Sequence, residues 1–402
     1  MRTVLRIVAI ASLLCQLALA DGLTPRVNAV RVPDGGIQPQ IAVGGDGTIH
    51  LVYYRGEGAA GDLFYVQSTD NGETFSPAMR VNSQNQSAIA AGTIRGAHLA
   101  LGRNDRVHVA WNGSGKAEPK GPANPDLPKD SPYRYSSPML YARMNDPGTA
   151  FEAERNLMKH TYSLDGGGSI AADNSGHVYV VWHANSLRDD SRGEAARSVW
   201  VATSTNDGKT FAAEARANPD PTGACGCCGL RAHADTHGNL FVLYRSAEDT
   251  FNRDMRLLVS RDHGKSFSAR LLDPWKIGQC VMSSAGLFST KEAVFAAWET
   301  EAQVKFARID KLTASLVPPD MIVPDANSSS RKHPVLAENS AGQLILVWAE
   351  GTGWAKGGNV AWQIFDKAGK PVPGGAGLVE GVPVWSFAAG YSRRDGGFTI
   401  VY

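Results

Sequence analysis

The sequence predicts an all-β protein, a single β-propeller in which four-stranded sheets form the blades of a ring. Three observations predict this fold. A hairpin-like segment occurs seven times, and its closing aromatic residues lie 50 to 71 residues apart. Each copy alternates apolar and polar residues around a turn rich in Gly, Asp or Asn, which is typical of β-hairpins. A second strand pair lies between consecutive copies, and helical periodicity is nearly absent after residue 20.

The seven inner hairpins are residues 40–54, 98–112, 169–183, 230–245, 285–299, 335–350 and 387–402. Their closing aromatic residues are Tyr53, Trp111, Trp182, Tyr244, Trp298, Trp348 and Tyr402. Two hairpins per repeat make a four-stranded sheet, and a ring of such sheets buries both faces of each one. We expect the tryptophans to pack between blades, because large aromatic side chains dominate such cores.

The last repeat is incomplete, since six outer hairpins accompany seven inner ones and the last inner hairpin ends at Tyr402. The segment RVNAVRV, residues 26–32, can supply a missing outer strand and close the ring. Seven blades are therefore preferred over six. Residues 21–402 show no internal boundary and are expected to form one domain.

Residues 1–20 have the pattern of an export signal. Arg2 and Arg6 precede the apolar run IVAIASLLCQLALA, which ends in the small-residue pattern Ala18-Leu19-Ala20. No later segment approaches the roughly 18 apolar residues of a membrane-spanning helix. We expect an exported protein, periplasmic or extracellular, without a membrane span.

The charge balance excludes two classes of partner. Lys and Arg number 40 and Asp and Glu number 39, so the formal net charge is +1, with no long run of either sign. Nucleic acids and anionic membranes are bound by strongly basic surfaces, which this pattern does not provide. We expect the partner to be a glycan or a small acidic ligand, and the chain to be a monomer.

An octapeptide occurs three times in the outer hairpins, as STDNGETF at 68–75, STNDGKTF at 204–211 and SRDHGKSF at 260–267. Ser and Asp side chains accept bonds from nearby backbone N–H groups, and Gly permits a positive φ, so the motif suits a tight turn. It resembles the Asp box of bacterial neuraminidase repeats, S-x-D-x-G-x-x-[FW], with the second copy carrying its acid one place later. In that superfamily the box lies away from the ligand, so Asp70, Asp207 and Asp262 are expected to be structural.

The resemblance to the sialidase superfamily implies a site on the opposite face, where the longer connections gather. It also implies an arginine cluster for a carboxylate, a Tyr nucleophile beside a Glu, and an Asp acid. Arg31, in VRVP, is a candidate carboxylate ligand, but no Tyr-Glu pair can be assigned from spacing. The most charged connection, together with the end of the next inner hairpin, supplies four candidate catalytic residues: Arg245, Arg253, Asp249 and Glu299.

Four cysteines follow the signal, and the register places them on one rim. Cys225, Cys227 and Cys228 precede one inner strand in GACGCCGL, and Cys280 precedes the next in GQCVMSS. Two disulfides would persist in an oxidising compartment. A Cu(I) or Zn site, with help from Met282, and a reactive thiol are the alternatives, and the spacing does not choose among them.

Three functions therefore remain open. The first is a carbohydrate-active or carbohydrate-binding protein, with glycoside hydrolase-like chemistry if it is an enzyme. The second is a metal- or thiol-dependent protein centred on the four cysteines, with Cu or Zn the cofactor. The third is an interaction scaffold in which disulfides brace the loops.

Overall fold

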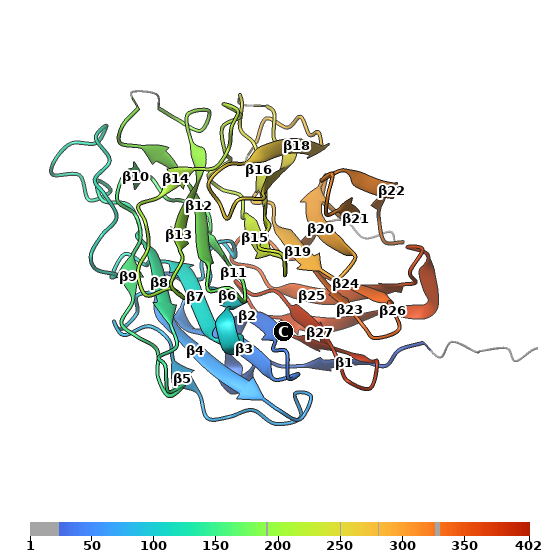
Figure 1. The fold of residues 1–402 in the computed structure, drawn as a ribbon. Helices are drawn as coiled ribbons and strands as arrows, with labels where there is room; N and C mark the ends of the chain where they lie inside the picture. Colours follow the sequence, from blue (N-terminus) through green and yellow to red (C-terminus); the bar gives the residue numbers. More distant parts are fainter. Residues whose placement is uncertain (1–23, 190–191, 250, 280, 326–329) are drawn as a thin grey trace, which may run out of the picture.

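The computed structural model describes residues 24–189, 192–249, 251–279, 281–325 and 330–402. Within these residues seven β-sheets surround a central axis, which confirms the predicted seven-bladed propeller (Figure 1). The predicted export signal, residues 1–20, lies outside the described residues. Among the described residues no helix is long and apolar enough to cross a membrane.

The strands follow one pattern in each blade. The innermost strands are β2 (Ile37–Val43), β6 (His98–Leu101), β11 (Ser169–Ala172), β15 (Arg231–Ala234), β19 (Ala285–Ser289), β23 (Arg331–Glu338) and β27 (Ala389–Ser392). The second strands are β3 (Ile49–Glu57), β7 (Val107–Asn112), β12 (Val178–Ser186), β16 (Leu240–Arg245), β20 (Ala293–Thr300), β24 (Leu344–Glu350) and β28 (Phe398–Val401). The third strands are β4 (Ala60–Ser68), β8 (Met139–Arg143), β13 (Ser198–Ser204), β17 (Met255–Ser260), β21 (Gln303–Asp310) and β25 (Gly358–Phe365). The outermost strands are β5 (Met79–Arg80), β9 (Arg155–Asn156), β14 (Ala215–Arg216), β18 (Ser268–Asp273), β22 (Leu316–Ile322) and β26 (Pro371–Val382). A short additional strand, β10 (Thr161–Tyr162), pairs with the end of β12.

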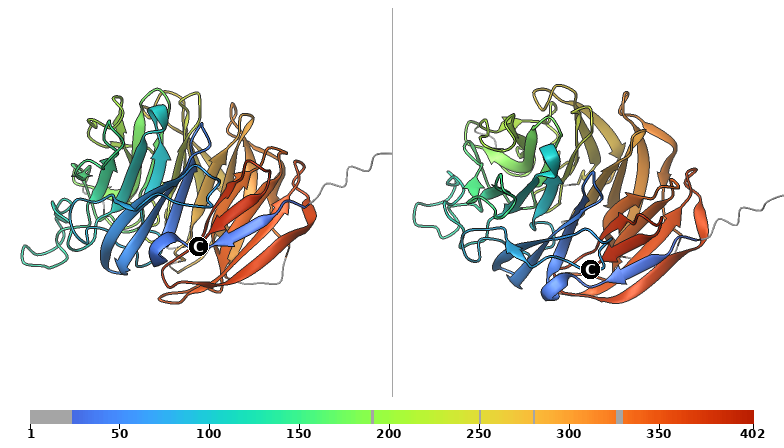
Figure 2. Two further views of the ribbon diagram at one scale, coloured as in Figure 1. Left: turned by 90° about the horizontal axis from the view of Figure 1, so that it is seen from below. Right: turned by 60° about the horizontal axis from the view of Figure 1, so that its bottom comes forward.

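The N-terminal segment closes the ring, as predicted. Strand β1 (Val27–Val30) pairs in parallel with β28, so that Val27 lies opposite Phe398 and Val30 opposite Val401. Figure 2 shows β1, in blue, beside the red C-terminal strands. In the described residues the seventh sheet has three strands, with β1 in the third position. It therefore has one strand fewer than the predicted four-stranded blade.

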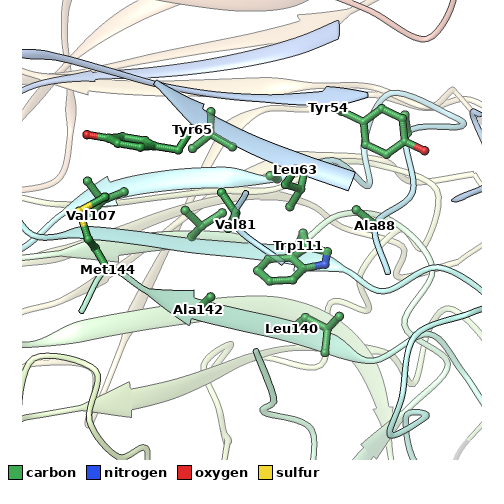
Figure 3. Close-up of a cluster of buried hydrophobic side chains, with 14 of the residues drawn as sticks. Tyr54, Leu63, Tyr65, Val81, Ala88, Val107, Trp111, Leu140, Ala142 and Met144 are labelled. Carbon is green, nitrogen blue, oxygen red and sulfur yellow. The ribbon is translucent and has the colours of Figure 1, made fainter. Parts of the chain in front are cut away.

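The hydrophobic core lies between adjacent blades. Between the first and second blades, Trp111 is buried against residues of both sheets, among them Leu63 and Leu140 (Figure 3). Trp182 and Trp298 occupy similar places in later blades and are fully buried. This confirms the predicted role of the tryptophans, because alternate side chains of each strand face opposite neighbours in the ring.

The octapeptide is a turn with a shared hydrogen-bond pattern. In the first copy the Ser68 hydroxyl accepts a bond from Gly72 N at 2.9 Å, and Asp70 Oδ1 accepts one from Thr74 N at 3.0 Å. The third copy repeats this pattern with Ser260 and Asp262 as the side-chain acceptors. The turns contact the preceding blade, so the motif is a joint between blades.

The second copy differs from the prediction at one position. Asn206, rather than Asp207, accepts the bond from Thr210 N at 2.9 Å, and therefore corresponds to Asp70. Asp207 instead points to the preceding blade, where Arg106 Nε donates to its Oδ2 at 2.5 Å and Arg143 Nη1 lies 3.6 Å from Oδ2. Asn206 thus keeps the role of turn acceptor, and the acid one place later forms an ion pair with the preceding blade.

The two faces of the ring differ. In antiparallel blades the turn between the first two strands and the turn between the last two lie at the same end. We call this end, which carries the octapeptides, the turn face. The opposite end, the loop face, carries the connections between blades and the loops between second and third strands, including residues 113–138 and 217–230.

A cavity of about 540 Å³ lies along the axis and is lined by all seven inner strands. It extends to turn-face residues such as Asp105, Asn174 and Thr236. Toward the loop face lies a second, smaller pocket of about 20 Å³, lined by residues that include Ile94, Leu230 and Phe387. This axial cavity therefore reaches the face that carries the octapeptides.

Candidate functional site

Three cysteine sulfurs converge on the loop face, in the connection between β14 and β15. The Sγ atoms of Cys225, Cys227 and Cys228 all lie within 4.8 Å of one another. Cys225 Sγ and Cys227 Sγ are 3.5 Å apart, well beyond the roughly 2.05 Å of a disulfide bond. Cys225 and Cys228 are buried and Cys227 is half-buried, so the cluster lies just beneath the surface.

Hydrogen bonds from the third and fourth blades hold this loop. Cys225 N donates to Arg245 O at 2.9 Å, and Gly226 O accepts a bond from Gly166 N at 2.6 Å. Gly226 N donates to Glu194 Oε1 at 3.2 Å. A Cβ at Gly226 would lie 1.6 Å from Arg197 Nη1, so a larger residue there would displace the Arg197 guanidinium. The C-G-C-C spacing therefore places the sulfurs together on a rigid support.

The environment keeps the thiols of Cys225 and Cys228 protonated. The hydrogen bond with Cys227, together with burial, raises the pKa of the Cys225 thiol to about 12. Burial raises the pKa of the Cys228 thiol well above its ordinary value. Reactive cysteines have lowered pKa values and exposed sulfurs. The arrangement therefore disfavours the reactive-thiol alternative at these two positions.

The fourth predicted sulfur cannot be placed, because Cys280 lies outside the described residues. Its neighbour Val281 packs against the cysteine cluster, and Gly229 N donates to Ser283 O at 2.9 Å. The two cysteine-bearing segments are thus neighbours on one rim, as the blade register predicts. A disulfide or a metal bond to Cys280 remains a prediction.

The two candidate catalytic arginines, Arg245 and Arg253, form hydrogen bonds to other residues of the protein. Arg245 is buried, and its guanidinium donates to Ser283 Oγ at 2.8 Å and to the backbone carbonyls of Arg253 and Glu299. Arg253 Nη2 donates to Glu194 Oε2 at 2.7 Å. Both side chains brace neighbouring loops.

The candidate acids lie in different settings. Asp249 accepts bonds from Phe251 N at 2.7 Å and from the Asn252 side chain at 3.0 Å, which shape its own turn. Glu299 is buried on β20, its Oε2 has no hydrogen-bond partner among the residues that the structure describes, and its Oε1 lies 3.8 Å from Lys332 Nζ. Burial raises the pKa of Glu299 to about 7. None of these bonds places the two acids around a shared opening.

Arg31 lies away from the loop-face centre. It is exposed, stacks over the Tyr402 ring at 4.1 Å and donates to the carbonyl of Gly381 at 2.5 Å. It therefore fastens the closing strand to the sixth blade. This bond does not fit the carboxylate-binding role that the sialidase resemblance implies.

Sequence reasoning missed one residue of the cysteine region. Glu194 links the cysteine loop to Arg253 through its two carboxylate oxygens. It lies in a long loop of the preceding blade, and its only signal in the sequence is a carboxylate in a connection on the cysteine-bearing face.

No model of a known protein family matches the chain, and no curated protein matches it in sequence. Solved structures match it in three dimensions. A protein of unknown function from Dyadobacter fermentans is 14% identical, with a TM-score of 0.53, and the match covers 84% of this chain and 96% of that one. An α-L-arabinanase from Penicillium chrysogenum is 11% identical, with a TM-score of 0.51 and coverage of 84% and 95%. The NanB sialidase from Streptococcus pneumoniae is 11% identical, with a TM-score of 0.50 and coverage of 81% and 67%. At these identities the matches establish the fold, a propeller of the kind found in sialidases and arabinanases.

Proposed function

We propose that this protein binds a thiophilic metal ion, Cu(I) or Zn²⁺, through Cys225, Cys227 and Cys228. The observation that carries the proposal is the convergence of three sulfurs within 4.8 Å on the loop face. Zn–S bonds of about 2.3 Å place the sulfurs of a tetrahedral site about 3.8 Å apart. The separation of 3.5 Å between Cys225 Sγ and Cys227 Sγ needs little change to meet this geometry.

The surroundings favour Cu(I). Soft thiolate ligands select Cu(I) and Zn²⁺, and a structural Zn²⁺ site needs a fourth ligand. Three thiolates and one Cu(I) carry a net charge of about −2, which needs compensation when buried. The Arg245 guanidinium, which interacts electrostatically with Cys228 and Cys225, supplies positive charge beneath the cluster.

Metal analysis and thiol counting test this proposal. The protein is purified without reductant or oxygen, its thiols are counted after denaturation, and Cu(I) is titrated against a chromogenic chelator. We expect one tightly bound Cu(I) per chain, lost in the Cys225→Ser/Cys227→Ser/Cys228→Ser variant. The single Cys227→Ser variant, at the half-buried position, provides the same test with less disturbance of packing. A Cys280→Ser variant asks whether the fourth sulfur takes part.

A second group of metal-ligating atoms provides the control. On the turn face, Asp173, His177 and His263 also lie within 4.8 Å of one another. The His177→Asn/His263→Asn variant should retain full Cu(I) binding if the cysteines form the site. Two intact disulfides with no metal bound, or unchanged binding in the triple serine variant, would contradict the proposal.

A second candidate function is glycan binding at the loop face. The observation that favours it is a set of exposed aromatic side chains in loop-face connections, among them Tyr133 at 81% exposure and Trp354 at 67%. Exposed aromatic rings offer apolar faces with polar edges, which suit an amphipathic ligand. A glycan array and a panel of chromogenic glycosides test this function. Loss of binding in Trp354→Ala would support it, whereas silence in both assays would leave an interaction scaffold.

A further inference from the structure

We propose that the axial cavity binds a small monocarboxylate, held by the guanidinium of Arg231. This site is separate from the cysteine cluster and reaches the opposite face. Arg231 is the first residue of the inner strand β15, and its side chain lines both the 540 Å³ cavity and the 20 Å³ pocket. A cavity of this size, lined by both apolar and polar side chains, is within the range of small-molecule sites.

The Arg231 side chain is anchored but not neutralised. Its Nε donates to Ala285 O at 2.9 Å, and Nη1 donates to Gln40 Oε1 at 3.1 Å and lies 2.8 Å from His98 Nε2. Nη2 makes no hydrogen bond to any described residue. Among the described residues, no carboxylate oxygen lies within the 4.0 Å of an ion pair. The Arg231 guanidinium thus lines the cavity, and its Nη2 has no hydrogen-bond acceptor among the described residues.

An isolated charge inside a protein is costly, and buried charges are usually paired. Burial lowers the pKa of Arg231 to about 10, which still leaves it charged at neutral pH. A carboxylate would accept hydrogen bonds from the planar guanidinium and cancel this charge.

The neighbouring histidines limit the ligand to one negative charge. Burial lowers the pKa of His98 well below its ordinary value, and it lowers the pKa of His233 to about 4. Both rings are therefore neutral near pH 7, and among the described residues that line the cavity Arg231 carries the one positive charge. A monoanion balances this charge, whereas a phosphate dianion or a citrate would leave excess negative charge.

The rest of the cavity suits an apolar body. Inner-strand side chains that line it include Ile41, Leu99 and Leu287, all partly buried. The turn-face end carries acidic side chains, Asp105, Asp173, Asp235 and Glu338. Asp235 follows β15 and lies about 13 Å from Arg231 along the strand at roughly 3.3 Å per residue. This acidic rim disfavours multiply charged anions, while an aliphatic or aromatic monocarboxylate meets Arg231 at the deep end.

Binding of paired acids and amides to the full chain tests the inference. Calorimetric titrations compare benzoate and pentanoate with benzamide and pentanamide, which have the same shape without the charge, and with phosphate and citrate. We expect saturable binding of a monocarboxylate, binding of its amide weaker by about tenfold or more, and no binding of citrate. Arg231→Met should abolish binding, while Arg55→Gln, at an exposed site, should leave it unchanged.

A conservative variant guards against misfolding of Arg231→Met. Arg231→Lys keeps the charge but loses the planar fork, so we expect a carboxylate affinity lower by about tenfold or more with the fold retained. Equal binding of acid and amide, affinity unaffected by Arg231→Lys, or no binding of any monocarboxylate to the wild type would each overturn the inference.

Discussion

Glu299 and Arg245 lie on neighbouring blades beneath the loop face, and their surroundings differ from those of exposed catalytic groups. The Arg245 guanidinium donates hydrogen bonds to backbone carbonyls and to the hydroxyls of Ser283 and Thr300. Glu299 is buried with one unpartnered oxygen. At the level of single residues, the sequence named these charged positions as candidates, but the partners that determine their surroundings come from other loops and blades.

The Glu299 carboxyl yields a prediction with a definite sign. Its pKa is raised to about 7 in the folded protein, so the folded state holds its proton more tightly than the unfolded state. Its contribution to stability is present below about pH 4.5 and is lost as the pH rises through 7. Glu299→Gln should therefore stabilise the protein at pH 8, by up to roughly 3 kcal/mol, and change little at pH 4.5.

Urea unfolding at the two pH values measures this effect, with Glu57→Gln at an exposed position as the control. A stability difference between Glu299→Gln and wild type that does not change with pH would contradict the assignment.

At the scale of elements, the octapeptide turns show how one local motif serves three joints. The glycine of each turn has a positive φ and faces the preceding blade. A Cβ at Gly208 would lie 1.8 Å from the Tyr141 hydroxyl, and one at Gly72 would lie 2.0 Å from the Tyr391 hydroxyl. At Gly264 the nearest atom would be 3.2 Å away. The same turn therefore tolerates different packing in different copies.

This difference predicts unequal costs for one substitution. Gly208→Ala and Gly264→Ala share the backbone strain of a positive φ, which costs about 1 kcal/mol. Gly208→Ala adds a steric clash with Tyr141 and should lose at least about 1 kcal/mol more. Chemical denaturation of both variants measures the gap, and Tyr141→Phe in the Gly208→Ala background should recover part of the loss. Equal costs at the two glycines would show that inter-blade packing does not limit this position.

At the scale of the whole molecule, closure of the ring depends on β1. Tyr402 N donates to Val30 O and Val32 N donates to Tyr402 O, both at 3.0 Å. Val27 and Val30 also pack into the clusters on the two sides of the seventh blade. The first and last parts of the chain are thus joined by hydrogen bonds and by apolar burial.

Removal of β1 should open the ring. A chain beginning at residue 33 should be less stable than one beginning at residue 24 by roughly 3 kcal/mol or more, because two valines and several hydrogen bonds are lost. Thermal and urea unfolding of the two truncations test this expectation. Equal stabilities would mean that the seven blades hold together without β1.

Three histidines near the axis predict loss of stability in acid. Burial lowers the pKa values of His98, His233 and His333 in the folded protein, to about 3 for His333. The contribution of these histidines to the free energy of unfolding is present above about pH 6.5. It is lost as the pH falls toward their pKa values in the folded protein. At pH 5 these three histidines and Glu299 together make the unfolded state bind about two more protons than the folded state. These four groups alone should therefore lower the stability by about 3 kcal/mol per unit fall in pH near pH 5, as measured by denaturant melts from pH 7 to 4.5. A flat profile over this range would show that the histidines are protonated in the folded protein.

The sequence alone determined the repeat, the seven blades, the closing role of the N-terminal segment and the structural nature of the octapeptide. These features depend on the alternation of apolar and polar residues and on turn residues a few positions apart, and both patterns can be recognised from the sequence. The cysteine cluster was predicted in part, because neighbouring blade entrances share a rim.

Only the tertiary structure decided how side chains from distant blades combine. Arg231 and Gln40 are 191 residues apart and meet across the axis, and Arg245 turns inward to brace three loops. The direction in which the axial cavity widens also depends on side chains contributed by all seven inner strands. Such contacts exist only once the ring has closed, so no local pattern in the sequence encodes them.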